Sequence, residues 1–211
     1  MDLSGSNVLI SGFTLYNGDD AIVVSPPSFN VTVRNVEAHG THGLSVSCTS
    51  GSGGNYTFED SVVYDSLIGC RFKGKGGKSC NLTDVHWRNI TMHNVSYPIH
   101  FIEDYVDPEA GGIPSDDELY AYTKNFTWEN IYGDIAATIG DGSCVSDPCW
   151  YHTEGWFAGF LIISIETNER PGESPEKGTY LLCEDADHCR DVVFSNIQLR
   201  TAVSTGILSI S

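Results

Sequence analysis

The chain has 211 residues, of which 40% are apolar, and this is enough to bury the core of one domain spanning residues 1–211. The formal net charge of -17 argues against nucleic acid as a partner, because phosphate binding needs a basic surface. No apolar run reaches the roughly eighteen residues of a membrane span, so we expect no membrane partner.

Cysteines and glycosylation sequons indicate the secretory route. Among the seven cysteines, two close pairs, Cys144 with Cys149 and Cys183 with Cys189, predict short disulfide loops of an oxidised protein. Six Asn-x-Ser/Thr sequons, more than chance comfortably supplies, occur at Asn30, Asn55, Asn81, Asn89, Asn94 and Asn125. No signal peptide precedes them, so we expect a secreted protein of which this chain is the C-terminal part. No zinc-ligand spacing is present, and we expect no metal or other cofactor.

Six segments repeat one pattern, at residues 8–13, 31–36, 56–61, 85–90, 126–131 and 192–197. In each, the first and third residues are apolar or aromatic, which is the alternation of a strand. The fifth is glycine, asparagine or aspartate, residue types that suit a sharp corner or a stacked amide ladder.

The spacing of these segments predicts the architecture. Their starts advance by 23, 25, 29, 41 and 66 residues, an interval in the twenties that insertions lengthen. We therefore predict an all-β fold, a parallel β-helix that is incomplete at its N-terminus, with loop insertions near 107–119 and 140–176. A β-sandwich is the alternative, but it does not require the same residue types at the same place in each unit.

A second column of strands follows the first, at residues 21–24, 43–46, 69–72 and 98–101. Stacking of this column places Cys70 in an inward position, so we expect a buried free thiol there. Cys48 and Cys80 then remain as candidates for a third disulfide.

The same register brings charged residues from three coils together. Asp20, which follows Asp19, and His42 each come directly before a second-column strand, so they should lie one coil apart on one edge of a sheet. On the next coil, Arg71 and Lys73 alternate with inward residues and should point outward. We therefore expect the five side chains to converge on one exposed face.

Each of these residues also has a purely structural interpretation. Adjacent aspartates in a glycine-containing turn are most often solvated turn residues. The histidine is one of seven, and cations two positions apart on a strand commonly cover an exposed face. The shared register favours a functional site over these separate interpretations.

Four short runs resemble the motif series of the polygalacturonases, family 28 of the glycoside hydrolases: Asn17-Gly-Asp-Asp-Ala-Ile22, Gly40-Thr-His-Gly-Leu-Ser-Val-Ser47, Arg71-Phe-Lys73 and Ile102-Glu-Asp-Tyr105. That family carries Asp-Asp, Gly-His-Gly and Arg-Ile-Lys in this order on a right-handed parallel β-helix, followed by a tyrosine that contacts substrate. Residues 142–150 resemble the exo-acting fungal members more than the endo-acting ones. The resemblance covers nearly the whole chain.

The resemblance implies inverting hydrolysis of α-1,4-galacturonosyl bonds in acidic plant cell-wall polysaccharide, pectin or polygalacturonate. It makes Asp19 the general acid and lets Asp20 help to polarise the attacking water, while His42 keeps the acid oriented and protonated. Arg71 and Lys73 would hold a galacturonate carboxylate, a task suited to a guanidinium fork and an ammonium. Tyr105 takes the place of the tyrosine that contacts substrate. We expect a secreted, exo-acting monomer.

Local charge agrees with an anionic substrate although the whole chain is acidic. Arg71, Lys73, Lys75 and Lys78 place four of the eleven Lys and Arg residues within eight positions. A local cationic strip is what binding of an anionic sugar needs. An exposed loop kept soluble by lysines is the structural alternative.

The chain departs from the family pattern in two places, and other functions stay open. Asp2 aligns with the last residue of the family's first motif, so a third catalytic aspartate would lie two positions before Met1. Ala21 stands where the family has a cysteine, so one customary disulfide is absent. The alternatives are a catalytically inactive β-helix that binds acidic polysaccharide, a hydrolase of rhamnogalacturonan or xylogalacturonan, and a calcium-dependent pectate lyase on a similar solenoid.

Overall fold

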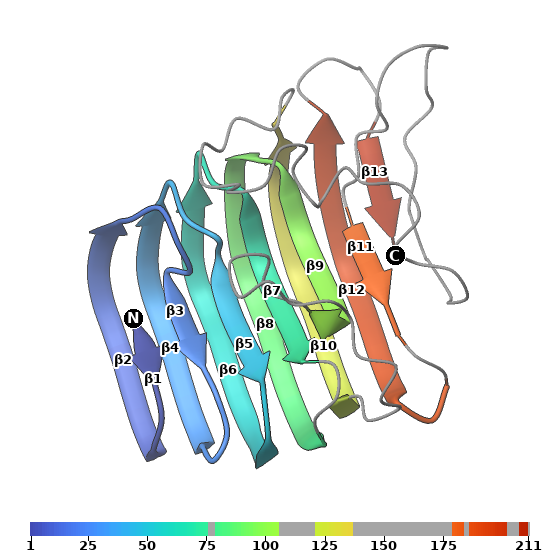
Figure 1. The fold of residues 1–211 in the computed structure, drawn as a ribbon. Helices are drawn as coiled ribbons and strands as arrows, with labels where there is room; N and C mark the ends of the chain where they lie inside the picture. Colours follow the sequence, from blue (N-terminus) through green and yellow to red (C-terminus); the bar gives the residue numbers. More distant parts are fainter. Residues whose placement is uncertain (76–78, 106–120, 137–178, 184–185, 202–206, 211) are drawn as a thin grey trace, which may run out of the picture.

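The computed structural model describes residues 1–75, 79–105, 121–136, 179–183, 186–201 and 207–210, and every regular element in this part of the chain is a strand (Figure 1). The strands form two sheets. In the described residues, no helix is long and apolar enough to cross a membrane.

The first sheet, sheet A, has six parallel strands in the order β1-β3-β5-β7-β9-β11. Its strands are β1 (Asp2–Leu3), β3 (Ile22–Val24), β5 (Leu44–Cys48), β7 (Ile68–Lys75), β9 (Tyr97–Tyr105) and β11 (Thr179–Leu182). Each of these strands comes from a different coil of the chain, so residues at equal positions in successive coils stack.

The second sheet, sheet B, has seven strands in the order β13-β12-β10-β8-β6-β4-β2, and only the β12–β13 pair is antiparallel among those described. Its strands are β2 (Ser6–Tyr16), β4 (Phe29–His39), β6 (Gly51–Tyr64), β8 (Cys80–Val95), β10 (Ala121–Ile135), β12 (Cys189–Thr201) and β13 (Ile207–Ile210). Apart from β13, odd-numbered strands belong to sheet A and even-numbered strands to sheet B, because each coil contributes one strand to each sheet.

The predicted parallel β-helix is confirmed down to its register. The six repeated segments lie in β2, β4, β6, β8, β10 and β12, and they pair position by position: Val8 lies opposite Val31, and Phe126 opposite Val192. The second column is also in register, since Cys70 lies between Leu44 and Ile99. The predicted insertions at 107–119 and 140–176 lie outside the described residues.

Sheet B bends where asparagine and aspartate adopt a left-handed backbone. The predicted corner residues have positive φ, from 49° at Asp60 to 75° at Gly12. Side chains of this column form a hydrogen-bonded ladder along the axis of the β-helix. In it, the Asn89 amide donates to Asp60 and the Asn130 amide donates to Asn89, each at 2.9 Å. A second column of left-handed residues was not predicted; it comprises Asn7, Asn30, Asn55, Asp84, Asn125 and Asp191.

Aromatic rings stack on one another along the core. Phe58, Trp87, Trp128 and Phe194 stack from coil to coil with ring centroids 5.5, 5.1 and 4.9 Å apart. Such offset stacks contribute beyond the apolar area that they bury.

The structure pairs Cys48 with Cys80 and Cys183 with Cys189, whereas Cys70 is a buried free cysteine. The remaining predicted pair, Cys144 with Cys149, lies outside the described residues.

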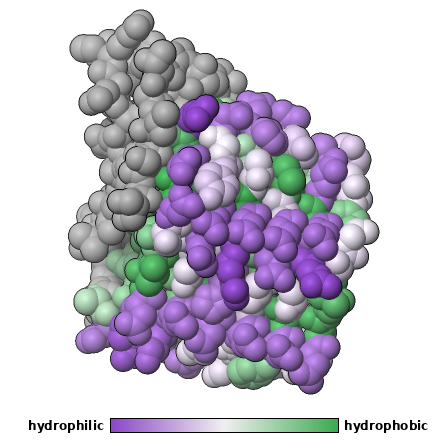
Figure 2. Space-filling view, turned by 180° about the vertical axis from the view of Figure 1, so that it is seen from behind, coloured by the Kyte–Doolittle hydropathy of each residue, from purple (hydrophilic) through white to green (hydrophobic). Residues whose placement is uncertain are grey.

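Figure 2 shows that the face of the molecule opposite to the view of Figure 1 is mostly hydrophilic, with scattered apolar patches. The polar surface agrees with the charge of the chain.

Candidate active site

The charged residues singled out in the sequence come together at sheet A. Asp19 and Asp20 lie in the turn between β2 and β3, and His42 lies in the corresponding turn of the next coil, between β4 and β5. Arg71 and Lys73 lie on β7, where they pair with Ser45 and Ser47 of β5. Their neighbours on β7, Cys70 and Phe72, belong to the core.

Asp20 is the centre of this cluster. Its side chain is only 6% exposed, and both of its oxygens are bonded. Oδ1 accepts hydrogen bonds from Arg71 Nη1 at 3.1 Å and from Ser45 Oγ at 2.5 Å, and Oδ2 accepts one from the Lys73 ammonium. Three coils therefore meet at one carboxylate.

The ionisation of Asp20 is decided by competing effects. Burial alone would raise the pKa of this carboxyl, but the charges of Arg71 and Lys73, with hydrogen bonds from Lys73 and Ser45, outweigh it and lower the pKa below 3.8. Asp20 is thus an anion at neutral and mildly acidic pH. It can orient or polarise a water molecule, but it does not carry a proton to donate.

Asp19 lies in a different environment although it is the next residue. Its side chain is 82% exposed, and Oδ1 lies 3.3 Å from Nδ1 of His42. The same Oδ1 accepts the backbone N–H of Asp20 at 2.6 Å, and the Asp19 carbonyl accepts the His42 N–H at 2.9 Å. These bonds hold the exposed carboxylate and the imidazole in one place, where substrate can reach the carboxylate.

Tyr105 closes the cluster from the far end of β9. Its ring centroid lies 5.2 Å from Cζ of Arg71 and 5.6 Å from Nζ of Lys73, within the range of cation–π interaction. Of the two cations, Arg71 is only 3% exposed, whereas Lys73 is 17% exposed. The Arg71 guanidinium therefore binds Asp20 from a buried position, and the Lys73 ammonium is the more accessible of the two cations.

Two supporting residues were not predicted from the sequence. Ser45 donates to Asp20, and Asn17 Nδ2 donates to the carbonyl of Asp20 at 3.0 Å. Ser45 occupies an outward position of the second column, aligned with Arg71, and this alternation was the signal that could have revealed it. Both residues fix the turn that carries the two carboxylates.

His100 was also not predicted. It lies opposite Arg71 in the register, is 2% exposed, and makes an edge-to-face contact with Tyr97 at 5.9 Å. Burial lowers the pKa of His100 well below 6.5, and the charges of Arg71 and, to a smaller extent, His42 lower it further. The negative charge of Asp20 raises this pKa but does not offset the other effects. The residue next to the cationic pair along the sheet is thus a neutral imidazole.

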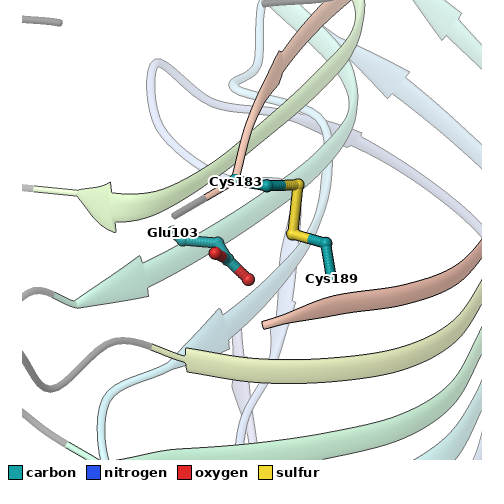
Figure 3. Close-up of side chains that lie close together, drawn as sticks. All are labelled: Glu103, Cys183 and Cys189. Atoms are coloured by element: carbon teal, nitrogen blue, oxygen red, sulfur yellow. A yellow bond between two sulfur atoms is a disulfide. The ribbon is translucent and has the colours of Figure 1, made fainter. Parts of the chain in front are cut away.

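One group in the described residues has the spacing of metal ligands, and it includes Glu103 near the C-terminal end of β9. Glu103, Cys183 and Cys189 place their ligand atoms within 4.8 Å of one another. Figure 3 shows the Glu103 carboxylate beside a disulfide, however, and the bonded sulfurs are not thiolates that could bind a metal. Glu103 is buried and accepts a hydrogen bond from Thr123 at 3.3 Å.

With this geometry established, comparison with known proteins identifies the family. A model described as "Glycosyl hydrolases family 28" matches residues 1–142. The chain belongs to this family. The predicted resemblance is therefore confirmed over more than half of the sequence.

Curated members of glycosyl hydrolase family 28 match over most of the chain. The chain is 34% identical to "Probable exopolygalacturonase C" of Aspergillus flavus over 206 residues, which is 94% of the chain and 44% of that protein. It is 35% identical to the protein of the same name in Aspergillus terreus, with the same coverage of both. "Probable endopolygalacturonase D" of Neosartorya fischeri is 29% identical over 67% of the chain. The chain spans less than half of the length of these relatives.

A solved structure supports the fold independently. The endo-xylogalacturonan hydrolase from Aspergillus tubingensis superposes with a TM-score of 0.53, covering 64% of this chain and 39% of that one. At 21% identity this similarity concerns the fold alone. It agrees with the parallel β-helix described above.

Proposed function

We propose that the protein takes part in the hydrolysis of α-1,4-galacturonosyl bonds in pectin or polygalacturonate, by an inverting mechanism. The observation that supports this most is the contrast between two adjacent carboxylates. Asp20 is buried against two cations, and Asp19 is exposed beside an imidazole. Glycoside hydrolysis by inversion needs two carboxyl groups with different roles, and different surroundings provide them.

In this proposal Asp19 donates a proton to the leaving glycosidic oxygen. His42, with Nδ1 3.3 Å from Oδ1 of Asp19, holds the carboxyl in place. Asp20 stays ionised and accepts a hydrogen bond from the attacking water, which makes that water more nucleophilic. The water attacks the anomeric carbon from the face opposite to the leaving oxygen, so the configuration inverts.

Cationic side chains would bind the substrate. The galacturonate carboxylate meets Lys73, the more accessible cation, with Arg71 behind it and the Tyr105 ring alongside. Lys75, which is exposed at the end of β7, continues the strip, and Lys78 lies outside the described residues. The substrate is thus an acidic plant polysaccharide, and the protein works as a secreted monomer without a cofactor.

Release of reducing ends from polygalacturonate tests this proposal. The variant Asp19→Asn removes the proton donor and should lower turnover by about 10²-fold or more. The control Lys124→Gln changes an exposed lysine of sheet B and should leave turnover unchanged. Full turnover in Asp19→Asn would contradict the proposal, and binding of polygalacturonate without any new reducing ends would favour the inactive polysaccharide-binding alternative.

We further propose that cleavage proceeds from the chain end, because the curated relatives with the highest identities above are named exopolygalacturonases. Early products then consist of one short species rather than a ladder of lengths. Separation of the first products by anion-exchange chromatography checks this, and oligomers of mixed length at early times would contradict exo action.

A further inference from the structure

Two successive backbone amides, those of Thr41 and His42, tie the turn that carries the imidazole to neighbouring coils. The His42 N–H donates to the carbonyl of Asp19, in the β2–β3 turn, at 2.9 Å. The Thr41 N–H donates to Oγ of Ser66, in the β6–β7 turn, at 2.9 Å. Thr41 and Ser66 are 0% and 4% exposed, so water does not take the place of the second bond. The turn of His42 is thus held between the coil before it and the coil after it.

The Ser66 hydroxyl lies at the centre of a buried hydrogen-bond network. A hydroxyl has one proton, and the Tyr64 carbonyl accepts that of Ser66 at 2.7 Å. Ser66 Oγ therefore acts as an acceptor toward Thr41, from the N–H and from Oγ1 at 3.3 Å. Thr41 Oγ1 in turn accepts the N–H of Gly43 at 3.0 Å. The residues on either side of His42 are thus both bonded, directly or through Thr41, to one serine of the next coil.

We propose that Ser66 is a positioning residue for the reaction, which fixes the turn that holds His42 beside Asp19. The inference rests on the proposed function, because it assigns His42 a part in hydrolysis. Ser66 is buried and acts only through the turn. The contact between His42 Nδ1 and Asp19 Oδ1, at 3.3 Å, is already at the long end of a hydrogen bond, so a small displacement of the turn breaks it.

The same serine geometry recurs away from the site, and it provides a matched control. Ser61 Oγ accepts the N–H of Val36 on the preceding coil at 3.1 Å and donates to the Glu59 carbonyl at 2.8 Å. Ser61 is 2% exposed and lies in β6 of sheet B. Ser61→Ala and Ser66→Ala remove equivalent pairs of bonds and should lower the denaturation midpoint by similar amounts. Of the two serines, Ser66 is the one bonded to the turn of His42.

Steady-state kinetics on polygalacturonate tests the inference. Ser66→Ala should lower kcat by about ten-fold and change KM by less than about two-fold, because a displaced imidazole affects the transition state rather than substrate binding at Lys73. Ser61→Ala should keep the kcat and KM of the wild type. An unchanged kcat in Ser66→Ala, or an equal loss of kcat in both variants, overturns the inference.

Variants of Thr41 keep the test decisive if Ser66→Ala does not fold. Thr41→Val replaces the hydroxyl by a methyl group of similar size, which removes the link from Gly43 to Ser66, and it should also lower kcat. Thr41→Ser keeps the hydroxyl and should retain the kcat of the wild type. Equal kcat values in Thr41→Val and Thr41→Ser overturn the inference.

Hydrogen exchange of the His42 amide separates this inference from the proposed function. Exchange of the His42 N–H should be about ten-fold faster or more in Ser66→Ala than in Ser61→Ala, whether or not the chain turns over substrate. This difference in a wild-type background without turnover would contradict hydrolysis and support the tie between Ser66 and the turn of His42. Equal exchange rates of the His42 amide in the two variants overturn the inference.

Discussion

Asp19 and Asp20 are neighbours in sequence but lie in opposite environments. The turn sends one carboxylate into solvent beside His42 and the other beneath the surface toward Arg71 and Lys73. Like charges on adjacent residues are thereby kept apart, and each is compensated by a different partner.

We predict that Asp20→Asn destabilises the protein by about 3 kcal/mol at pH 7. The variant leaves Arg71 and Lys73 next to each other without their shared anion in a largely buried place, and loss of one partner of a buried ion pair typically costs that much. Chemical denaturation measures the difference. Asp19→Asn is the matched control and should change the free energy of unfolding by less than about 0.5 kcal/mol, since its side chain is exposed.

Acid should remove the same stabilisation in the wild-type protein. The pKa of Asp20 is lowered on folding, so its contribution is present above about pH 4 and is lost as the pH falls through the lowered value. Asp20→Asn should therefore show a weaker loss of stability below pH 4 than the wild type. Parallel acid titrations of the two proteins would contradict this account.

His100 predicts a second pH dependence, in a different range. Its pKa in the folded protein lies well below the unfolded value of 6.5, so the unfolded state binds a proton first. Stability contributed by neutral His100 is present above pH 6.5 and falls by up to about 1.4 kcal/mol for each pH unit below it. His100→Gln should reduce this slope between pH 6.5 and 5 in denaturation experiments. An unchanged slope would show that His100 is not the group responsible.

For the individual residues of the site, the sequence predicted which side chains meet but not how deeply each one is buried. Register alone placed Asp20, His42, Arg71 and Lys73 together, because stacking fixes the position of each outward residue. It did not reveal that Arg71 is almost buried or that Ser45 donates to Asp20. Those contacts depend on side-chain rotamers and on the shape of the turn, which the inward–outward alternation of residues along a strand does not specify.

At the scale of the strands, one bend of sheet B was predicted and the other was not. The fifth position of the repeat signalled the corner at Asn35, Asp60 and Asn89, where types that tolerate positive φ recur. The other corner contains Asn30 and Asn55, which the sequence presented as sequons. A residue type that serves both glycosylation and tight bends is ambiguous until the stacking is known.

Asn130 gives a quantitative test of the ladder. It has φ of 56°, donates to Asn89 at 2.9 Å and accepts from Asn196 at 2.7 Å. Asn130→Ala should cost about 3 kcal/mol, from the lost hydrogen bonds of the side-chain amide and a strained left-handed backbone. Asn130→Gly loses the bonds without the strain and should cost about 1 kcal/mol less. Equal denaturation midpoints for the two variants would show that backbone strain plays no part.

The whole molecule combines an acidic surface with a site that contains basic residues. The net charge is -17, yet Arg71 and Lys73 lie together on one side of sheet A. The solenoid permits this because each coil adds one outward residue to a column, independently of the charge elsewhere. The β-helix itself was predictable, since the repeat encodes it. The predicted loop insertions near 107–119 and 140–176 lie outside the described residues.

The most direct test of the account is the configuration of the first sugar released. Proton NMR of polygalacturonate during early digestion distinguishes the two anomers before they equilibrate. An attack by water positioned at Asp20, with Asp19 as the acid, inverts the α-linkage, so the account predicts that the β-anomer appears first. Initial appearance of the α-anomer would contradict it.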